Sequence, residues 1–133
     1  MLKSRAARLL SEALVVEALG CLSNVTRLQI YRLLVRTGRN GLVAGEIGNK
    51  LRLPASNLSF HLKSLLHTEL VSVEQQGRYQ RYRANIPLML RIIAYLTENC
   101  CSDEPTQCDA FRSAVPDLRP FLPPLVDRAD QTT

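Results

Sequence analysis

The stretch VAGEIGNKLRLPASNLSFHLKSLLHTELVSVEQQGRYQRYRAN, residues 43–85, determines the fold. It begins with two short helical patterns, at about residues 43–51 and 55–67. Pro54 disfavours helix just before it and suits the first turn of the second helix. Over residues 70–84 apolar and polar residues alternate instead, with Gly77 near the middle, which predicts a two-stranded hairpin. Helix, turn, helix and hairpin in this order predict a winged helix-turn-helix, a mostly α-helical fold with a small β-hairpin wing.

Three more helices are expected around this stretch. Apolar residues recur at helical spacing over about residues 4–19, which predicts a first amphipathic helix. A second, strongly apolar helix should follow Ser23, a suitable N-cap, and end at Thr37-Gly38, and we expect it at the centre of the core. The last helix, at residues 88–98, is too apolar to stand alone in water. Apolar helices at both ends of a small domain predict a dimer.

Length and charge limit the possible functions. A chain of 133 residues with 46% hydrophobic content has room for one ordinary core. We place a domain for DNA binding and dimerisation at residues 1–98 and a cysteine-containing tail with a disordered end at residues 99–133. Residues 1–84 carry 13 Lys or Arg against 5 Asp or Glu, and residues 85–133 carry 4 against 7. The first part therefore suits a polyanion, although a basic surface without a partner is the alternative.

The N-terminal part has no uninterrupted apolar stretch of the length found in signal peptides or membrane spans. Charged residues such as Arg5, Arg8, Glu12 and Glu17 interrupt the apolar ones. We therefore expect a cytoplasmic protein with no membrane partner.

Polar side chains on the outward faces of residues 55–67 are candidates for contact with double-stranded DNA. A helix can enter the major groove with short polar groups near its N-terminal part at base edges, and a basic hairpin can lie along the neighbouring backbone or minor groove. The simpler alternatives are that the polar residues only start the helix and that the hairpin is a solvated edge strand. A polar helix face next to a basic hairpin favours DNA over both. Tyr82 is expected in the core, because its two neighbours point the other way. The candidate DNA-binding residues are Ser56, Asn57, Ser59, His61, Lys63, Arg78, Tyr79 and Arg81.

The four cysteines are Cys21, which stands alone, and the group Cys100, Cys101 and Cys108. In a cytosolic chain such clustering indicates a metal, metalloid or redox site rather than a disulfide framework. Three soft thiolates suit trivalent arsenic or antimony, which form three bonds, whereas a structural zinc site normally takes a fourth protein ligand. The alternative is that Cys100 and Cys101 are small buried hydrophobes or a redox pair, and Cys21 is expected in the core. No organic cofactor is expected.

Three motifs carry a resemblance to a known family. They are T-R-L-x-I-x-x-L-L in the second helix, S-x-x-S-x-H-L-x-x-L from Ser56 to Leu65, and G-R-x-x-x-Y from Gly77 to Tyr82. With them, about residues 14–85 resemble the ArsR/SmtB family of metal- and metalloid-responsive repressors. The resemblance implies a homodimer that binds operator DNA without an inducer and releases it when the inducer binds.

The sequence departs from the family at two sensor sites. Many metalloid-sensing members carry C-V-C at the start of the helix before the recognition helix, where this chain has Leu42-Val43-Ala44-Gly45. Residues 88–98 also lack the His and Asp ligands of zinc-sensing relatives. The vicinal Cys pair with a third Cys after the last helix is similar to some members of the arsenic-responsive branch. We therefore expect release by trivalent arsenic, as arsenite or methylarsenite, or by antimonite.

Three alternatives stay open from the sequence. The same fold can carry a thiol redox switch made of the three C-terminal cysteines. A constitutive DNA binder would show no ligand-dependent change in affinity. An enzyme with a Cys-His pair is disfavoured, because no acid partner or oxyanion motif accompanies any of these residues. We expect His61 to face DNA or to bond the backbone, and His67 to lie exposed at a helix end, where a cation complements the dipole.

Overall fold

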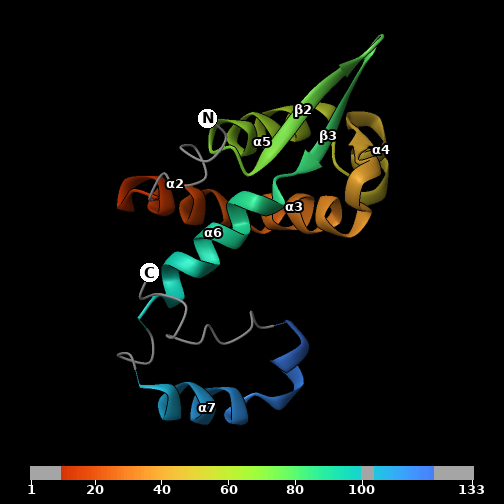
Figure 1. Cartoon of the computed structure of the whole chain (residues 1–133). Coiled ribbons are helices and arrows are strands. Elements are labelled where there is room, and N and C mark those ends of the chain that lie inside the picture. Colours follow the sequence, from red (N-terminus) through yellow and green to blue (C-terminus); the bar gives the residue numbers. More distant parts are fainter. Residues whose placement is uncertain (1–9, 100–103, 122–133) are drawn as a thin grey trace. The chain divides into compact units, whose positions relative to one another are not determined.

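The computed structural model describes residues 10–99 and 104–121 and divides the chain into two compact units, Met1–Leu96 and Thr97–Thr133. Figure 1 shows the elements of the first unit: helices, a small sheet and a projecting hairpin. In chain order they are α2 (Glu12–Leu22), α3 (Val25–Thr37), a 3₁₀ turn (Gly38–Asn40), β1 (Leu42–Val43), α4 (Ala44–Leu51), α5 (Ala55–His67), β2 (Val71–Gln76), β3 (Tyr79–Ala84) and α6 (Ile86–Thr97). The winged helix-turn-helix predicted from the sequence is confirmed.

The sheet has three antiparallel strands in the order β1-β3-β2. Strands β2 and β3 form the predicted hairpin, and β1 adds a short third strand in which Leu42 faces Tyr82. The sequence prediction had Val43 in a helix, and this was wrong. Helix α4 begins one residue later, where the Glu46 carboxylate accepts a hydrogen bond from the Val43 N–H at 3.2 Å.

The core of the first unit gathers around α3, as predicted. Helix α3 buries Ile30, Tyr31 and Leu34, and α5 contributes a stripe of buried leucines, Leu58, Leu62 and Leu65. Tyr82 and Cys21 are also buried, in agreement with the sequence analysis. The largest fully buried side chains are Ile30, Leu34, Ile47, Leu65, Leu70 and Ile92. They come from α3, α4, α5 and α6 and from the residue just before β2. One core therefore holds these helices and the hairpin together.

Helix boundaries near the N-terminus differ from the prediction. Ser23 does not cap α3; its hydroxyl donates to the Gly20 carbonyl at 2.7 Å and closes α2. Asn24 is the N-cap of α3, and its side-chain oxygen accepts from the Arg27 N–H at 3.1 Å. Helix α2 begins after Ser11 and continues to Leu22, while residues 4–9 of the expected first helix lie outside the described residues.

The second unit contains a helix that the sequence analysis did not predict. Helix α7 (Pro105–Ala114) begins with proline in its first turn, and a 3₁₀ segment (Pro116–Phe121) follows it. A proline in the first turn followed by Gln, Ala and Arg is the signal that indicates this helix. The expected disordered end of the tail, after Phe121, lies outside the described residues. Within the described part of the chain, no helix has the length and apolar character needed to cross a membrane.

Candidate nucleic-acid interface

The turn between α4 and α5 sets the direction of the second helix. Arg52 ends α4 in the left-handed conformation with φ of 53°, and the Leu53 N–H donates to the Gly48 carbonyl at 2.9 Å. Space is narrow here, since a Cβ on Gly48 would lie 3.3 Å from the Leu53 carbonyl oxygen. Pro54 stands at the N-cap of α5 with extended backbone. This compact turn packs α5 against the core along its leucine stripe.

The opposite face of α5 is exposed and polar. Ser56, Asn57, Ser59 and Lys63, four of the candidate DNA-binding residues, lie exposed on this helix. Short hydroxyl and amide groups in the first turns can donate and accept hydrogen bonds at base edges and phosphates. The ammonium group that follows them can donate to phosphates. The face is therefore chemically suited to the major groove.

His61 has a different environment from these four residues. It is half-buried, and its Nδ1 lies 3.3 Å from Nη1 of Arg27. Arg27 is held in turn by α2, because its Nε donates to the Cys21 carbonyl oxygen at 2.6 Å. Since a guanidinium only donates, this contact requires His61 to accept at Nδ1. The candidate His61 thus joins α5 to the α2–α3 junction.

Phe60 is a residue of this face that the sequence analysis missed. Its side chain is 64% exposed, and its ring meets the His61 ring edge-on with centroids 5.5 Å apart and planes at 69°. The helical period contained the signal, because Phe60 stands two residues from both Leu58 and Leu62 of the buried stripe. At about 100° per residue it points directly away from the core.

The wing presents Arg78 and Tyr79 near its tip. Both candidates are exposed, and Tyr79 is 65% exposed. They lie beyond Gly77, whose φ of 59° suits the tight turn of the hairpin. A cation and an aromatic ring at the end of a projecting hairpin can reach a phosphate backbone or a minor groove.

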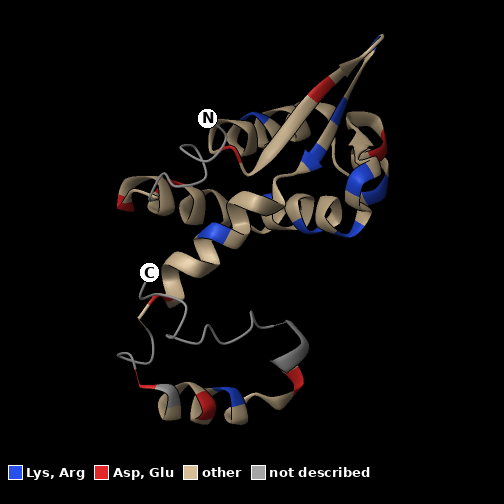
Figure 2. Cartoon of the chain, viewed as in Figure 1, with Lys and Arg blue, Asp and Glu red and all other residues tan. Residues whose placement is uncertain are grey.

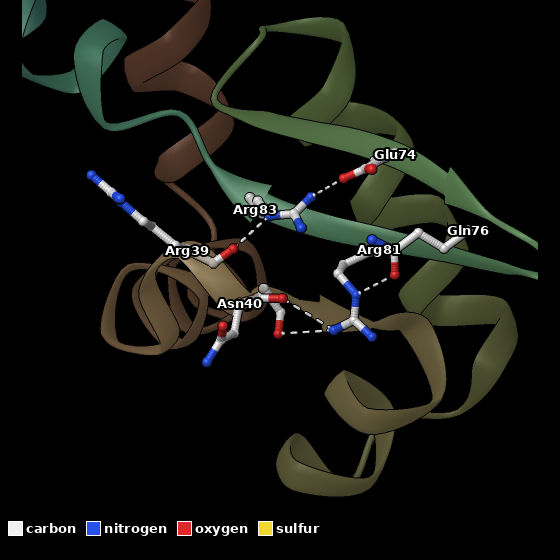
Figure 3. Close-up of polar contacts among 7 residues, drawn as sticks. Arg39, Asn40, Glu74, Gln76, Arg81 and Arg83 are labelled. Carbon is white, nitrogen blue, oxygen red and sulfur yellow. Dashed lines mark hydrogen bonds and ion pairs between the residues drawn. The ribbon is translucent and has the colours of Figure 1, made fainter.

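Arg81, the last candidate of the wing, is half-buried and makes contacts within the protein (Figure 3). Its Nε donates to Oε1 of Gln76 at 2.8 Å, and its Nη1 donates to the carbonyl oxygens of Asn40 at 3.1 Å and Gly41 at 3.4 Å. The guanidinium therefore ties the hairpin to the segment before β1. These contacts give Arg81 a positioning role in the wing.

Arg83 forms a second link at the base of the wing. Its Nε donates to the Arg39 carbonyl oxygen at 2.7 Å, and its Nη1 lies 2.6 Å from Oε2 of Glu74 on the neighbouring strand, as Figure 3 shows. The hydrogen bond from Arg83, with a further one from Gln76, holds the pKa of the Glu74 carboxyl below its usual range. The Glu74 carboxylate therefore stays ionised beside the basic strand.

Basic residues surround the interface, although acidic ones are interspersed. Figure 2 shows Lys and Arg on α5, on β3 and around the junction of α3 and α4, with Glu on α4 and β2. The uneven charge of the chain places 13 of its 17 Lys and Arg in residues 1–84. This distribution favours a polyanionic partner for the first unit.

Of the candidate metalloid ligands, the structure describes Cys108 alone. It lies in α7, is half-buried, and is disulfide-bonded. Cys100 and Cys101 lie outside the described residues. Within residues 10–99 and 104–121, no group of three His, Cys, Asp or Glu side chains could hold a metal ion. His67 lies exposed at the end of α5, as expected.

Comparison with known proteins agrees with this architecture. Residues 22–74 match the family model described as a helix-turn-helix domain. No curated protein matches the chain. An ArsR-like transcriptional regulator from Rhodococcus sp. RHA1 is similar with a TM-score of 0.56 and 25% identity, over 77% of this chain and 93% of that one.

Two further solved structures extend the comparison. HlyU from Vibrio cholerae N16961 is 30% identical over 63% of this chain and 91% of its own length, with a TM-score of 0.52. The homodimeric winged helix-turn-helix DNA-binding domain of Mb0332 from Mycobacterium bovis is 20% identical over 70% of this chain and 86% of that one, with a TM-score of 0.52, and shares the fold. The motifs, the fold and these relatives together show that the chain belongs to the ArsR/SmtB family of winged helix-turn-helix transcriptional regulators.

Proposed function

We propose that the protein is a repressor that binds double-stranded operator DNA as a homodimer and is released by a trivalent arsenical or by antimonite. The observation that carries the DNA-binding part is the exposed polar face of α5, with Ser56, Asn57 and Lys63 on a helix held by the core. Arg78 and Tyr79 on the wing add contacts to the sugar-phosphate backbone. A reading helix in the major groove and a cationic hairpin beside it are the docking geometry of this fold.

Exposed apolar side chains on the outer helices support the homodimer. Val16 and Leu19 on α2 and Leu90 and Leu96 on α6 are all between 41% and 67% exposed. Apolar surface on helices at both ends of a small domain favours a second copy as the occupant. Two copies would place two recognition helices on one side of the duplex, about 34–36 Å apart for half-sites one turn apart. The Mycobacterium bovis relative, whose fold is the same, is homodimeric.

The inducer part of the proposal depends on thiolate chemistry. Cys100, Cys101 and Cys108 supply three soft donors within nine residues. A trivalent arsenic or antimony centre forms three bonds and prefers sulfur to nitrogen or oxygen. Joining the three sulfurs ties the segment of Cys108 to the residues that follow α6. Because α6 is a candidate dimerisation helix, that tie would change the spacing of the two recognition helices. A coupling of about 1–3 kcal/mol corresponds to a 5–150-fold loss of operator affinity.

The test is a DNA-binding titration by fluorescence anisotropy. Fully reduced protein is bound to an operator duplex under anaerobic conditions, with a phosphine as reductant because dithiols themselves bind arsenic. Arsenite, methylarsenite and antimonite are then added separately, and the mass of the adduct is measured. We expect release by at least one of them. Release that is absent at saturation with all three would contradict the inducer part and leave DNA binding untouched.

Two variants assign the release to the C-terminal group. Cys108→Ser should bind the operator as the wild type does and should need much more arsenical for release. Cys21→Ala is the matched control, because Cys21 is 8% exposed, belongs to the core of the first unit and is free. It should retain normal release. Equal release of DNA by the wild type and by Cys108→Ser would show that Cys108 is not a ligand of the arsenical.

A redox-responsive repressor of the same fold is the second candidate. The observation that favours it is the disulfide at Cys108. In this version, oxidation of two thiols to a disulfide by an agent such as diamide would release the DNA, and a thiol reductant would restore binding. Arsenical addition without oxidant would then leave the reduced protein on its operator. The two candidates therefore give opposite results in the anaerobic titration.

A further inference from the structure

We propose that Phe60 determines part of the operator sequence by contacting the C5 methyl group of a thymine in the major groove. This inference rests on the proposed DNA-binding function and names a base and a residue that recognises it. Phe60 lies on α5 at the middle of the face that points away from the core, between the exposed Ser56 and Lys63. Its 64% exposure leaves most of the ring available to a partner.

The chemistry of the major groove selects thymine as the target. Base edges there present hydrogen-bond donors and acceptors, and the thymine C5 methyl is the apolar group among them. A phenyl ring makes no hydrogen bond, so contact with a donor or acceptor would remove that group's water without replacing it. Contact with a methyl instead buries apolar surface on both sides.

The neighbours of Phe60 indicate nucleic acid as the occupant. An open groove of about 680 Å³ runs beside the ring and is lined by Arg27, Lys63 and His67 as well as Glu17. Two cationic side chains and an imidazole against one carboxylate, beside an exposed ring, suit a polyanion that also carries apolar groups. A second copy of this basic face is a poorer occupant, because like charges would oppose each other.

Phe60 also has a ring contact within the protein before any DNA binds. Its ring meets the His61 ring edge-on at 5.5 Å, an arrangement that aromatic pairs favour. His61 lies 3.3 Å from Arg27, and Arg27 bonds the Cys21 carbonyl at the end of α2 at 2.6 Å. This series of contacts connects the ring, through His61 and Arg27, to two other helices and favours one orientation of the ring. A restrained side chain loses less conformational entropy on binding than a free one.

The test replaces thymine by uracil, which removes the methyl and leaves every hydrogen-bonding group. A binding duplex is first selected from a random pool with the wild-type protein, and each thymine is then changed singly to deoxyuridine. We expect one position per half-site at which the wild type loses roughly fourfold in affinity, about the effect of one buried methyl group. The Phe60→Ala variant should bind the thymine and uracil duplexes equally at that position.

Two controls complete the experiment. Phe60→Leu, which keeps an apolar side chain, should retain a preference for thymine, while Arg32→Ala, at an exposed position on α3, should leave the uracil effect unchanged. A wild type that tolerates uracil everywhere in a duplex it binds selectively would overturn the inference and leave the proposed function intact. Failure of the selection to yield any preferred duplex would instead contradict the proposed function. Dissociation of Phe60→Ala into monomers, seen by sedimentation, would also overturn the inference by assigning the ring to a subunit interface.

Discussion

At the scale of single residues, Arg27 connects three parts of the first unit. Its N–H helps to start α3 through the Asn24 cap, its Nε bonds the Cys21 carbonyl, and its Nη1 reaches His61. The side chain therefore links the end of one helix to the middle of the recognition helix, 34 positions later in the sequence. Such a link couples the stability of the domain to the orientation of its DNA-binding face.

We expect Arg27→Met to lower the free energy of unfolding by about 1 kcal/mol, the typical net value of a hydrogen bond, and to weaken operator binding several-fold. Urea denaturation and anisotropy titration measure the two effects. Arg32→Met is the matched control, since Arg32 lies exposed on the same helix and its loss changes the charge equally. Equal losses of affinity in both variants would mean that charge alone matters and that the link to His61 does not.

Gly41 permits the close approach of the segment before β1 to the wing. Its φ is 59°, and an added Cβ would overlap the Tyr82 carbonyl oxygen and the Arg83 side chain. We expect Gly41→Ala to destabilise the domain by about 1–3 kcal/mol, measured by urea denaturation. Gly20→Ala should instead be neutral or stabilising by up to about 1 kcal/mol, because Gly20 lies inside α2 with open space around its Cβ position. A neutral Gly41→Ala would contradict the steric argument.

At the scale of elements, the wing depends on two arginines at its base. Arg83 holds Glu74 and the Arg39 carbonyl, so loss of its guanidinium should loosen β2 against β3. We expect Arg83→Met to increase amide hydrogen exchange in the hairpin while the core helices stay protected. Arg78→Met, which changes an exposed cation in the turn, should leave the exchange unchanged. Uniformly faster exchange across α3 would show that Arg83 serves the whole domain instead.

The same pair predicts a pH effect. The hydrogen bond from Arg83 lowers the pKa of Glu74, so the folded state binds a proton here less readily than the unfolded chain does. The interaction is therefore complete above the usual glutamate pKa and is lost as the pH falls through the lowered one. A titration of the Glu74 carboxyl by NMR should give a midpoint below the usual value in the wild type and a return to it in Arg83→Met. Identical midpoints in the two proteins would exclude the interaction in solution.

The elements also show what the sequence can predict and what it cannot. Helical and alternating periods are local, and they predicted α3, α5, the hairpin and the burial of Tyr82 correctly. Strand β1 was missed because its two residues gain order from pairing with β3, about 40 positions away. Helix α7 was not predicted, although Pro105 in its first turn is a signal for a helix start.

The candidate site also combines features that the sequence predicts with features that only the fold produces. Exposure of Ser56, Asn57, Ser59 and Lys63 follows from the position of the leucine stripe, so the sequence sufficed for it. The Arg81 contacts with Asn40 and Gly41 and the His61 contact with Arg27 join residues 34 to 41 positions apart, and only the folded chain brings them together. Phe60 is intermediate, because its outward direction follows from the period but its contact with a restrained His61 does not.

At the scale of the whole molecule, the proposed dimer would set how strongly the protein binds DNA. In such a dimer each copy would contact one half-site, and joining two copies would make the second contact effectively intramolecular. The apolar surface of α6 is the region we expect to hold the copies together, and Leu90, at 60% exposed, is a prominent part of it. A charge placed there would have to be buried without a partner in the dimer but would remain solvated in the monomer.

We therefore expect Leu90→Glu to sediment as a folded monomer and to bind a two-half-site operator roughly a hundredfold more weakly than the wild type. Its affinity for a single half-site should equal that of one wild-type subunit, because the exposed face of α5 and the wing are unchanged. Val35→Glu is the control: Val35 is 40% exposed on α3, and the variant should stay dimeric and bind normally. If Leu90→Glu remained a dimer while Val35→Glu dissociated, the interface would involve α3 instead of α6. Movement of α6 by the thiolate site would then have no route to the spacing of the recognition helices.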